Sequence, residues 1–314
     1  MSSASKYLPR YSEVAMQVLL TGGNGFIGSW VAKRLIARGV AVRVFATRED
    51  RGPLRAIAGS DADEAEWFVG DVSDIVQVER SARGCDAIIH IAAILGPASA
   101  ADPLRCMTVN LGGTLNMFEI ARQRGIGKLI YTTSAAVFGP VDGAHPYPST
   151  HYGAMKLAEE GCARAYFDRD RMPSIGFRPF VVYGPGREKG MSAGPSFACR
   201  AAARGEAYTM PFSGRTNFVY VDDCASAYEE ALFAEPQKAE IFNLAGDATG
   251  VEDFIAEVRK IEPSADIRIE GDPLPFAPDL VPDGRDTLLP NVQRTSLVDG
   301  IAATIAYYRE QDEA

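Results

Sequence analysis

The chain has 314 residues, 46% of them hydrophobic, and carries a formal net charge of −9. That length is enough to bury a large core, either in one large domain or in two that share a cleft. An acidic chain without a Lys/Arg-rich run is poorly suited to bind nucleic acid or an anionic membrane, and no uncharged run is long enough to span a bilayer.

Cysteine and histidine usage argues against cross-links and metal sites. The five cysteines are odd in number and widely spaced, and the three histidines lack metal-ligand spacing. A reducing compartment is the simpler explanation, so we expect a cytoplasmic protein that binds no metal. Residues 1–15 contain charged side chains and no continuous apolar stretch, which predicts a poorly ordered leader and not a signal peptide.

The first half of the chain alternates short apolar strands with amphipathic helices. This alternation is typical of an α/β fold with a parallel, doubly wound sheet. The predicted strands cover residues 18–20, 40–45, 66–69, 87–91, 128–131 and 174–177, and the predicted helices cover residues 26–38, 110–124 and 153–167.

The pattern changes after Phe180, where glycine and proline become frequent among predicted loops, short strands and a few helices. We therefore expect a first domain over residues 16–180 and a smaller α/β part over residues 181–314. Since no clean linker separates them, the two parts are predicted to interleave. The second part is expected to cover the open edge of the sheet and to shape a substrate pocket.

A glycine-rich turn follows the first predicted strand. Gly22, Gly25 and Gly28 have the G-x-x-G-x-x-G spacing, and the next helix begins at Phe26 and Ile27. The first glycine permits a tight turn, the second lets a pyrophosphate approach the backbone, and the third lets helix and strand pack closely. Because the helix N-terminus offers free N–H groups and a second strand follows in time, this unit predicts a Rossmann-type dinucleotide-binding domain.

The end of the second strand bears on the choice of cofactor. Many such sites carry an acid there, bonded to the ribose hydroxyls, whereas this strand tip has none and is followed by Arg48. An arginine at this place can pair with a 2′-phosphate, which favours NADP over NAD. The alternative is a solvated loop arginine near Glu49 and Asp50.

Three later residues form a candidate catalytic set. Tyr152 and Lys156 are four residues apart on a stretch with helical character, which places both side chains on one face. A nearby ammonium lowers the pKa of a phenol, so Tyr152 can take a proton from an alcohol or return one to a ketone. Lys156 can also hold the nicotinamide ribose, and Ser134, at the end of a buried strand, can hold the substrate oxygen. His151 either lines the pocket or only occupies a loop position.

Together these residues resemble the extended short-chain dehydrogenase/reductase family, also called the NAD-dependent epimerase/dehydratase family, over nearly the whole chain. Residues 21–28 are similar to the family's TGGxGFIG turn, and Ser134, Tyr152 and Lys156 take the catalytic places. The further cofactor contacts that the resemblance implies are Asp71, Val72, Ile91, Ala92, Ala93, Asn110, Pro179, Phe180 and Val182.

Departures from the family pattern bear on the substrate. Ala135 and Ala136 stand where family dehydratases carry an Asp-Glu pair, so sugar dehydration is not expected. Val181 and Thr216 stand where many sugar-nucleotide epimerases of the family carry an Asn and a phosphate-binding Arg, although Arg215 is adjacent. These changes favour a smaller hydroxy or keto compound, such as a polyol, a sugar acid or an amino-acid derivative.

The candidate substrate contacts are Ser134, Ala135, Ala136, Tyr152 and Arg187. Arg187 follows the segment implied to lie near the nicotinamide, and it is either an anion contact or a solvated loop arginine.

Three functions remain open. The first is an NAD(P)-dependent oxidoreductase that interconverts a secondary alcohol and a ketone. The alternative is an epimerase of the same family, which oxidises its substrate and then reduces the other face. The third is a non-catalytic cofactor sensor, which the presence of both Tyr152 and Lys156 disfavours. The family resemblance also implies a homodimer in which residues 103–124 and 152–168 form a four-helix bundle, although their apolar residues could equally belong to the core.

Overall fold

The structure, a computed structural model, describes residues 16–280 and 283–313, so the predicted leader lies outside it. Its centre is a seven-stranded sheet in which every strand pair is parallel. Across the sheet the strands are β10 (Ala239–Leu244), β6 (Ser174–Pro179), β5 (Lys128–Thr132), β4 (Ala87–His90), β1 (Gln17–Thr21), β2 (Ala41–Ala46) and β3 (Glu66–Val69). The predicted doubly wound sheet is confirmed, and the predicted strand ends are shifted by only one or two residues.

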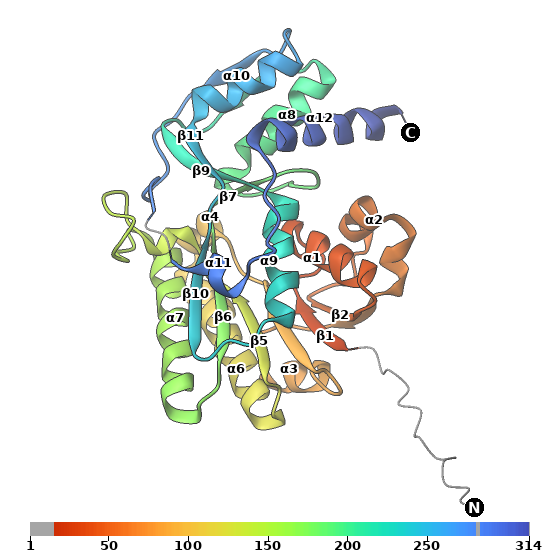
Figure 1. Cartoon of the computed structure of the whole chain (residues 1–314), viewed down its shortest axis with the longest axis vertical. Coiled ribbons are helices and arrows are strands. Elements are labelled where there is room, and N and C mark those ends of the chain that lie inside the picture. The colour runs from red at the N-terminus through yellow and green to blue at the C-terminus, as the bar shows by residue number, and fades with distance from the viewer. Residues whose placement is uncertain (1–15, 281–282, 314) are drawn as a thin grey trace, which may run out of the picture.

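Helices cover both faces of this sheet (Figure 1). The helices α1 (Phe26–Ala37), α2 (Gly52–Ala58) and α9 (Val221–Phe233) pack on one face, and α3 (Ile75–Ser81), α6 (Gly113–Arg124) and α7 (His151–Asp170) pack on the other. Strand β1 shows why two cores form, because Val18 and Leu20 enter one cluster while Leu19 enters the other. Side chains alternate across a strand, and an apolar residue at every position therefore indicates burial on both faces.

The predicted helix over residues 110–124 is longer and less regular than its sequence pattern indicated. It is preceded by α5 (Pro103–Met107) and by a π-helical turn, η2 (Thr108–Gly112). The Asp102 side chain caps α5 by accepting the N–H of Arg105 at 2.9 Å. The wide turn directs the Asn110 side chain to both the N–H and the C=O of Ile94, at 2.7 and 2.9 Å. Such π-turns are frequent at functional sites.

Helix α7 begins two residues earlier than predicted. Thr150 caps it by accepting the N–H of Gly153 at 3.0 Å, so His151 is the first helical residue and is exposed. The proposed loop position for His151 is therefore wrong, and Tyr152 lies in the first turn of the same helix as Lys156.

Most elements of the second half form a smaller group above one end of the large sheet, whereas α9 lies beside that sheet and β10 belongs to it (Figure 1). One small sheet consists of β11 (Asp247–Gly250), β9 (Arg215–Tyr220) and β7 (Val181–Tyr183), and β12 (Ile267–Ile269) pairs with β8 (Tyr208–Met210). Strand β10 joins the large sheet beside β6. The other elements of the second half are η4 (Met191–Ala193), α8 (Gly194–Arg204), α10 (Val251–Ile261), α11 (Arg285–Leu288) and α12 (Leu297–Glu313). The first half also contains η1 (Gly59–Glu64), α4 (Gly96–Ala101) and η3 (Ala135–Val137).

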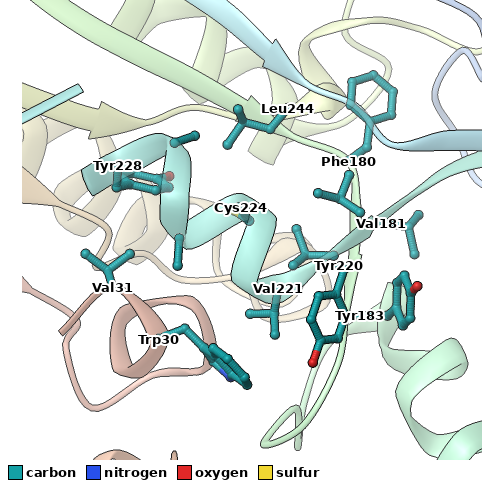
Figure 2. Close-up of a cluster of buried hydrophobic side chains, with 14 of the residues drawn as sticks. Trp30, Val31, Phe180, Val181, Tyr183, Tyr220, Val221, Cys224, Tyr228 and Leu244 are labelled. Atoms are coloured by element: carbon teal, nitrogen blue, oxygen red, sulfur yellow. The ribbon is translucent and has the colours of Figure 1, made fainter. Parts of the chain in front are cut away.

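An aromatic cluster joins the glycine-turn helix to these later elements (Figure 2). The ring centroids of Trp30 and Tyr220 lie 6.1 Å apart, and Tyr183 packs edge-on against Tyr220 at 5.8 Å. The Trp30 indole also donates to the Pro185 carbonyl at 3.1 Å. These contacts hold residues 181–187 against α1, next to the glycine turn. Among the helices that the structure describes, none is long and apolar enough to cross a membrane.

Candidate active site

The predicted site residues gather at the carboxyl edge of the large sheet. Strand β1 ends at Thr21, β4 at His90, β5 at Thr132 and β6 at Pro179. Because these strands are parallel neighbours, the residues that follow them meet at one edge, which is where ligands bind in open α/β sheets.

The glycine turn has a geometry that only glycine permits. Gly22 has a φ of +72°, and a Cβ at Gly28 would lie 2.1 Å from the Gly22 carbonyl oxygen. Gly25 is the N-cap residue of α1, and no side chain of the described residues caps that end. The first-turn N–H groups, which include those of Phe26 and Ile27, are therefore free to bind an anion. This cradle fits the pyrophosphate of a dinucleotide.

A buried Thr–His pair that sequence reasoning missed holds the next cofactor segment. Thr21 Oγ1 accepts the N–H groups of Ile91 and Ala92, each at 3.1 Å, and lies 2.7 Å from His90 Nδ1. Since its acceptor sites are used, the Thr21 hydroxyl donates to His90, which fixes the imidazole as the neutral Nε2–H tautomer. Burial, reinforced by the Lys156 charge, lowers the pKa of His90 to about 3. The backbone of Ala92 packs closely against Gly22, because a Cβ added at Gly22 would lie only 2.9 Å from the Ala92 nitrogen.

Two of the predicted cofactor contacts, Asp71 and Arg48, lie on the surface near α5 and β2. The Asp71 carboxylate accepts both the N–H and the hydroxyl of Ser73, and it forms an ion pair with Arg105 at 2.7 Å. Its neighbour Val72 is buried against Gly113. Arg48 follows β2 with 70% of its side chain exposed, paired with Asp50 at 3.0 Å.

Helix α7 brings the predicted catalytic pair together. The Lys156 ammonium lies 5.9 Å from the centre of the Tyr152 ring. Burial raises the pKa of the Tyr152 phenol, while the Lys156 charge and the Ser134 side chain oppose that shift. Strand β5 ends at Thr132, so Ser134 lies two residues beyond the strand and not at its end as predicted. Ser134 instead caps η3, where its hydroxyl accepts the N–H of Ala136 at 3.1 Å.

Lys156 is completely enclosed by protein groups that the sequence pattern did not identify. Its ammonium donates to the Thr132 carbonyl at 2.7 Å and to Glu159 at 3.0 Å. The neighbouring Glu160 accepts two bonds from Arg178, at 2.7 and 2.6 Å, and one from the Thr133 hydroxyl at 2.8 Å. The bonds of Glu160 to Arg178 tie α7 to β6, and its bond to Thr133 ties α7 to the segment that carries Ser134.

Arg187 is half-buried beside the site, so the solvated alternative is wrong. Its guanidinium donates to the Val182 carbonyl and to Ser192 Oγ at 3.0 Å, and it lies 5.3 Å from the centre of the Phe26 ring. Within residues 16–280 and 283–313, no carboxylate lies within 4.0 Å of it. Burial lowers its pKa to about 10, while Cys224 and Tyr152 act in the opposite direction.

The other candidate residues differ in exposure. Ala135, Phe180, Val181, Val182 and Thr216 are all buried. Phe180 donates its N–H to the Leu244 carbonyl at 3.2 Å, which holds the β6–β7 crossing against β10. Arg215 is exposed and forms an ion pair with Asp279 at 3.2 Å.

Comparisons with known proteins agree with this geometry. The model of the NAD dependent epimerase/dehydratase family matches residues 18–245. Over 322 aligned positions the chain is 27% identical to a UDP-glucose 4-epimerase of Mycolicibacterium smegmatis, a match that covers 95% of this chain and 100% of that protein. It is 29% identical to a sterol-4-alpha-carboxylate 3-dehydrogenase of Candida albicans, but this match covers 56% of this chain and only 53% of that enzyme.

A solved structure shows the same agreement over almost the full chain. The UDP-glucose 4-epimerase of Thermus thermophilus, in complex with NAD, superposes with a TM-score of 0.77 at 26% sequence identity. The superposition covers 94% of this chain and 99% of that chain.

Proposed function

The chain belongs to the NAD-dependent epimerase/dehydratase family, and from this premise we propose that it is an epimerase that inverts a secondary alcohol through a ketone. It is an enzyme of the extended short-chain dehydrogenase/reductase type, whose members carry out both oxidation and epimerisation. The proposal rests above all on the pair formed by the half-buried Tyr152 and the buried Lys156, beside Ser134.

The comparisons support epimerisation over net oxidation. The UDP-glucose 4-epimerase match covers 95% of this chain and 100% of that protein, whereas the dehydrogenase match spans about half of each. This reverses the order favoured by the sequence, which placed a dehydrogenase first. The dehydrogenase remains the second candidate, because Val181 and Thr216 depart from the pattern of sugar-nucleotide epimerases and both are buried in the fold.

The chain's own residues supply acid–base chemistry and orientation. A bound nicotinamide cofactor supplies the hydride acceptor and donor. Tyr152 takes the proton from the substrate hydroxyl during oxidation and returns it to the carbonyl oxygen during reduction. Lys156 favours the phenolate by its charge, and the Ser134 hydroxyl holds the substrate oxygen beside Tyr152.

Cofactor stoichiometry separates the two candidates. An epimerase converts many substrate molecules per cofactor with no lasting change in reduced-cofactor absorbance, whereas a dehydrogenase produces one reduced cofactor per product. The assay follows epimer pairs of nucleotide sugars, free sugars and sugar acids by NMR with cofactor below the enzyme concentration. Equal amounts of product and reduced cofactor would overturn the epimerase proposal in favour of the dehydrogenase.

We further propose that Arg187 binds an anionic group of the substrate. The guanidinium lies beside Phe26 of the glycine-turn helix, and Tyr152 acts to raise its pKa. Its hydrogen bonds run to the carbonyls of Val182 and Lys189 and to the Ser192 hydroxyl. A half-buried cation held only by neutral acceptors gains most from a carboxylate or phosphate. Substrates that carry such a group next to the reacting carbon are therefore expected to bind best.

The proposed cofactor is NADP, with Arg48 as the contact to its 2′-phosphate. The exposed guanidinium at the tip of β2 and the lack of an acid on that tip support this assignment. The ion pair with Asp50 competes with it, and the Thermus thermophilus structure contains NAD. The ratio of affinities for NADPH and NADH is the direct test.

We also propose a homodimer built on residues 103–124 and 152–168. Helices α6 and α7 lie side by side on one face of the molecule (Figure 1). At the start of the first segment, Leu104 and Met107 are 74% and 46% exposed, which leaves apolar surface uncovered. Light scattering is expected to give twice the mass of the chain, and a monomeric mass would refute this arrangement.

A further inference from the structure

Two consecutive glutamates, Glu159 and Glu160, are fully buried on the inner face of α7. Burying a carboxylate is costly unless another group compensates its charge. Glu160 has an evident structural partner in Arg178, which binds both of its oxygens. Glu159 has no arginine partner among the described residues, and its one charged contact there is the catalytic lysine.

The contact between Glu159 and Lys156 is short and sealed from solvent. Glu159 Oε2 lies 3.0 Å from Lys156 Nζ, and the two side chains are 0% and 2% exposed. The other oxygen, Oε1, has no hydrogen-bond partner in the described part of the chain. The Thr114 side chain of α6 also favours the charged form of this carboxylate, so within the described residues Lys156 is its one charged partner but not its only polar neighbour.

Helical spacing places this acid in line with the catalytic pair. Tyr152, Lys156 and Glu159 stand at positions i, i+4 and i+7 of α7, which form a stripe along one helix face. An ammonium has three N–H donors, and the Thr132 carbonyl and Glu159 take two of them. Two protein acceptors thus fix the long lysine side chain.

We propose that Glu159 is a positioning residue that completes a Tyr152–Lys156–Glu159 unit, anchoring the lysine and controlling how readily Tyr152 releases its proton. This inference rests on the proposed acid–base function of Tyr152. At the phenol, an isolated ammonium favours the phenolate strongly, whereas an ammonium paired with a carboxylate acts as a weaker dipole. Glu159 therefore keeps Tyr152 protonated to higher pH than Lys156 alone would allow.

The charged surroundings of Glu159 place its own titration in the neutral range. Burial raises its pKa to about 7, Lys156 and the Thr114 side chain of α6 oppose that shift, and Glu160 adds to it. The other titratable groups that interact with this unit are Cys106 of α5, Tyr131 of β5, Cys162 of α7, His90 of β4, Tyr228 of α9 and Arg187. Deprotonation of Glu159 near neutral pH thus changes the charge that Tyr152 experiences through Lys156.

The test is an NMR titration of the Tyr152 phenol in the full chain labelled at the tyrosine ring carbon bonded to oxygen. Tyr152→Phe identifies the resonance. In Glu159→Gln the phenol is expected to ionise about one pH unit lower than in the wild type, because a neighbouring negative charge has been removed. Glu159→Asp, which keeps the charge, is expected to restore most of the wild-type value.

Glu160→Gln is the matched control, since it removes an equally buried carboxylate that does not contact Lys156. It is expected to lower the unfolding temperature without moving the Tyr152 titration. The proposal is overturned if Tyr152 keeps its proton to the same pH in Glu159→Gln as in the wild type, or if both Gln variants shift it equally. The titration needs no substrate, so failure to find turnover would count against the proposed function and not against this inference.

Discussion

The substitution Gly28→Ala tests the glycine turn most sharply. A Cβ at Gly28 would meet three backbone atoms, the Gly22 oxygen at 2.1 Å, the Gly22 carbon at 2.8 Å and the Gly23 Cα at 2.8 Å. Ordinary contacts begin at 3.4 Å, so the turn and the helix must move apart by more than an ångström at the closest atom. None of these atoms is the end of a flexible side chain, and the strain must therefore deform the turn itself.

Overpacking of this kind costs about 1–3 kcal/mol of folding free energy. If the deformed turn loses a similar amount of binding free energy, the affinity for a nicotinamide dinucleotide falls by about 5- to 150-fold. Urea unfolding and calorimetric titration with NAD and NADP measure the two effects separately.

Gly161→Ala provides a control inside another helix. There the nearest atom to a new Cβ is the end of the Arg164 side chain at 3.8 Å, so the alanine fits. This change is expected to stabilise α7 by up to about 1 kcal/mol through helix propensity, with dinucleotide affinity unchanged. If Gly28→Ala has the same unfolding free energy and the same dinucleotide affinity as Gly161→Ala, the close packing inferred for the turn is refuted.

The other predictions concern single side chains. Because burial gives folded His90 a pKa of about 3 in place of 6.5, the unfolded chain binds more protons between these values. Stability therefore falls as pH drops through this window, by about 2 kcal/mol between pH 7 and pH 5 from this residue alone. In urea unfolding, His90→Asn should lose less stability between pH 7 and pH 5 than the wild type, by this same amount. An equal loss of stability in both proteins would contradict the low pKa assigned to His90. Arg48→Ala should weaken NADPH binding about tenfold while sparing NADH, and equal effects on both would exclude a 2′-phosphate contact. Arg187→Met should raise the Kd of anionic substrates by at least about tenfold and leave that of neutral analogues unchanged, whereas equal losses would show a purely structural role.

Sequence reasoning found the parts of the site that depend on local spacing. The glycine triplet and the Tyr152–Lys156 pair lie within single turns or helices, where periodicity alone fixes which side chains share a face. The spacing from Lys156 to Glu159 was equally available. It went unnoticed because an acid on a helix is ordinarily solvent-exposed, and only the packed structure shows that this one is buried.

Contacts between distant segments were beyond the reach of the sequence pattern. Thr21 and His90 are 69 residues apart and meet only because β1 pairs with β4. Likewise, Arg187 is a loop residue by sequence, and its burial depends on the packing of residues 181–187 against α1. Strand register and loop packing depend on contacts between residues far apart in the sequence. The spacing of residues within one helix or strand therefore does not predict them.

In the proposed reaction, hydride leaves and returns to the carbon that bears the hydroxyl deprotonated by Tyr152. An isotope label on that carbon tests this transfer directly. A substrate of the epimer panel carrying deuterium on the reacting carbon is converted in ordinary water, and the product is analysed by NMR. The account predicts that the epimer keeps deuterium on the same carbon and that Tyr152→Phe slows conversion by at least about 100-fold. Loss of the label to solvent would instead indicate epimerisation by direct removal of a carbon-bound proton and would contradict the account.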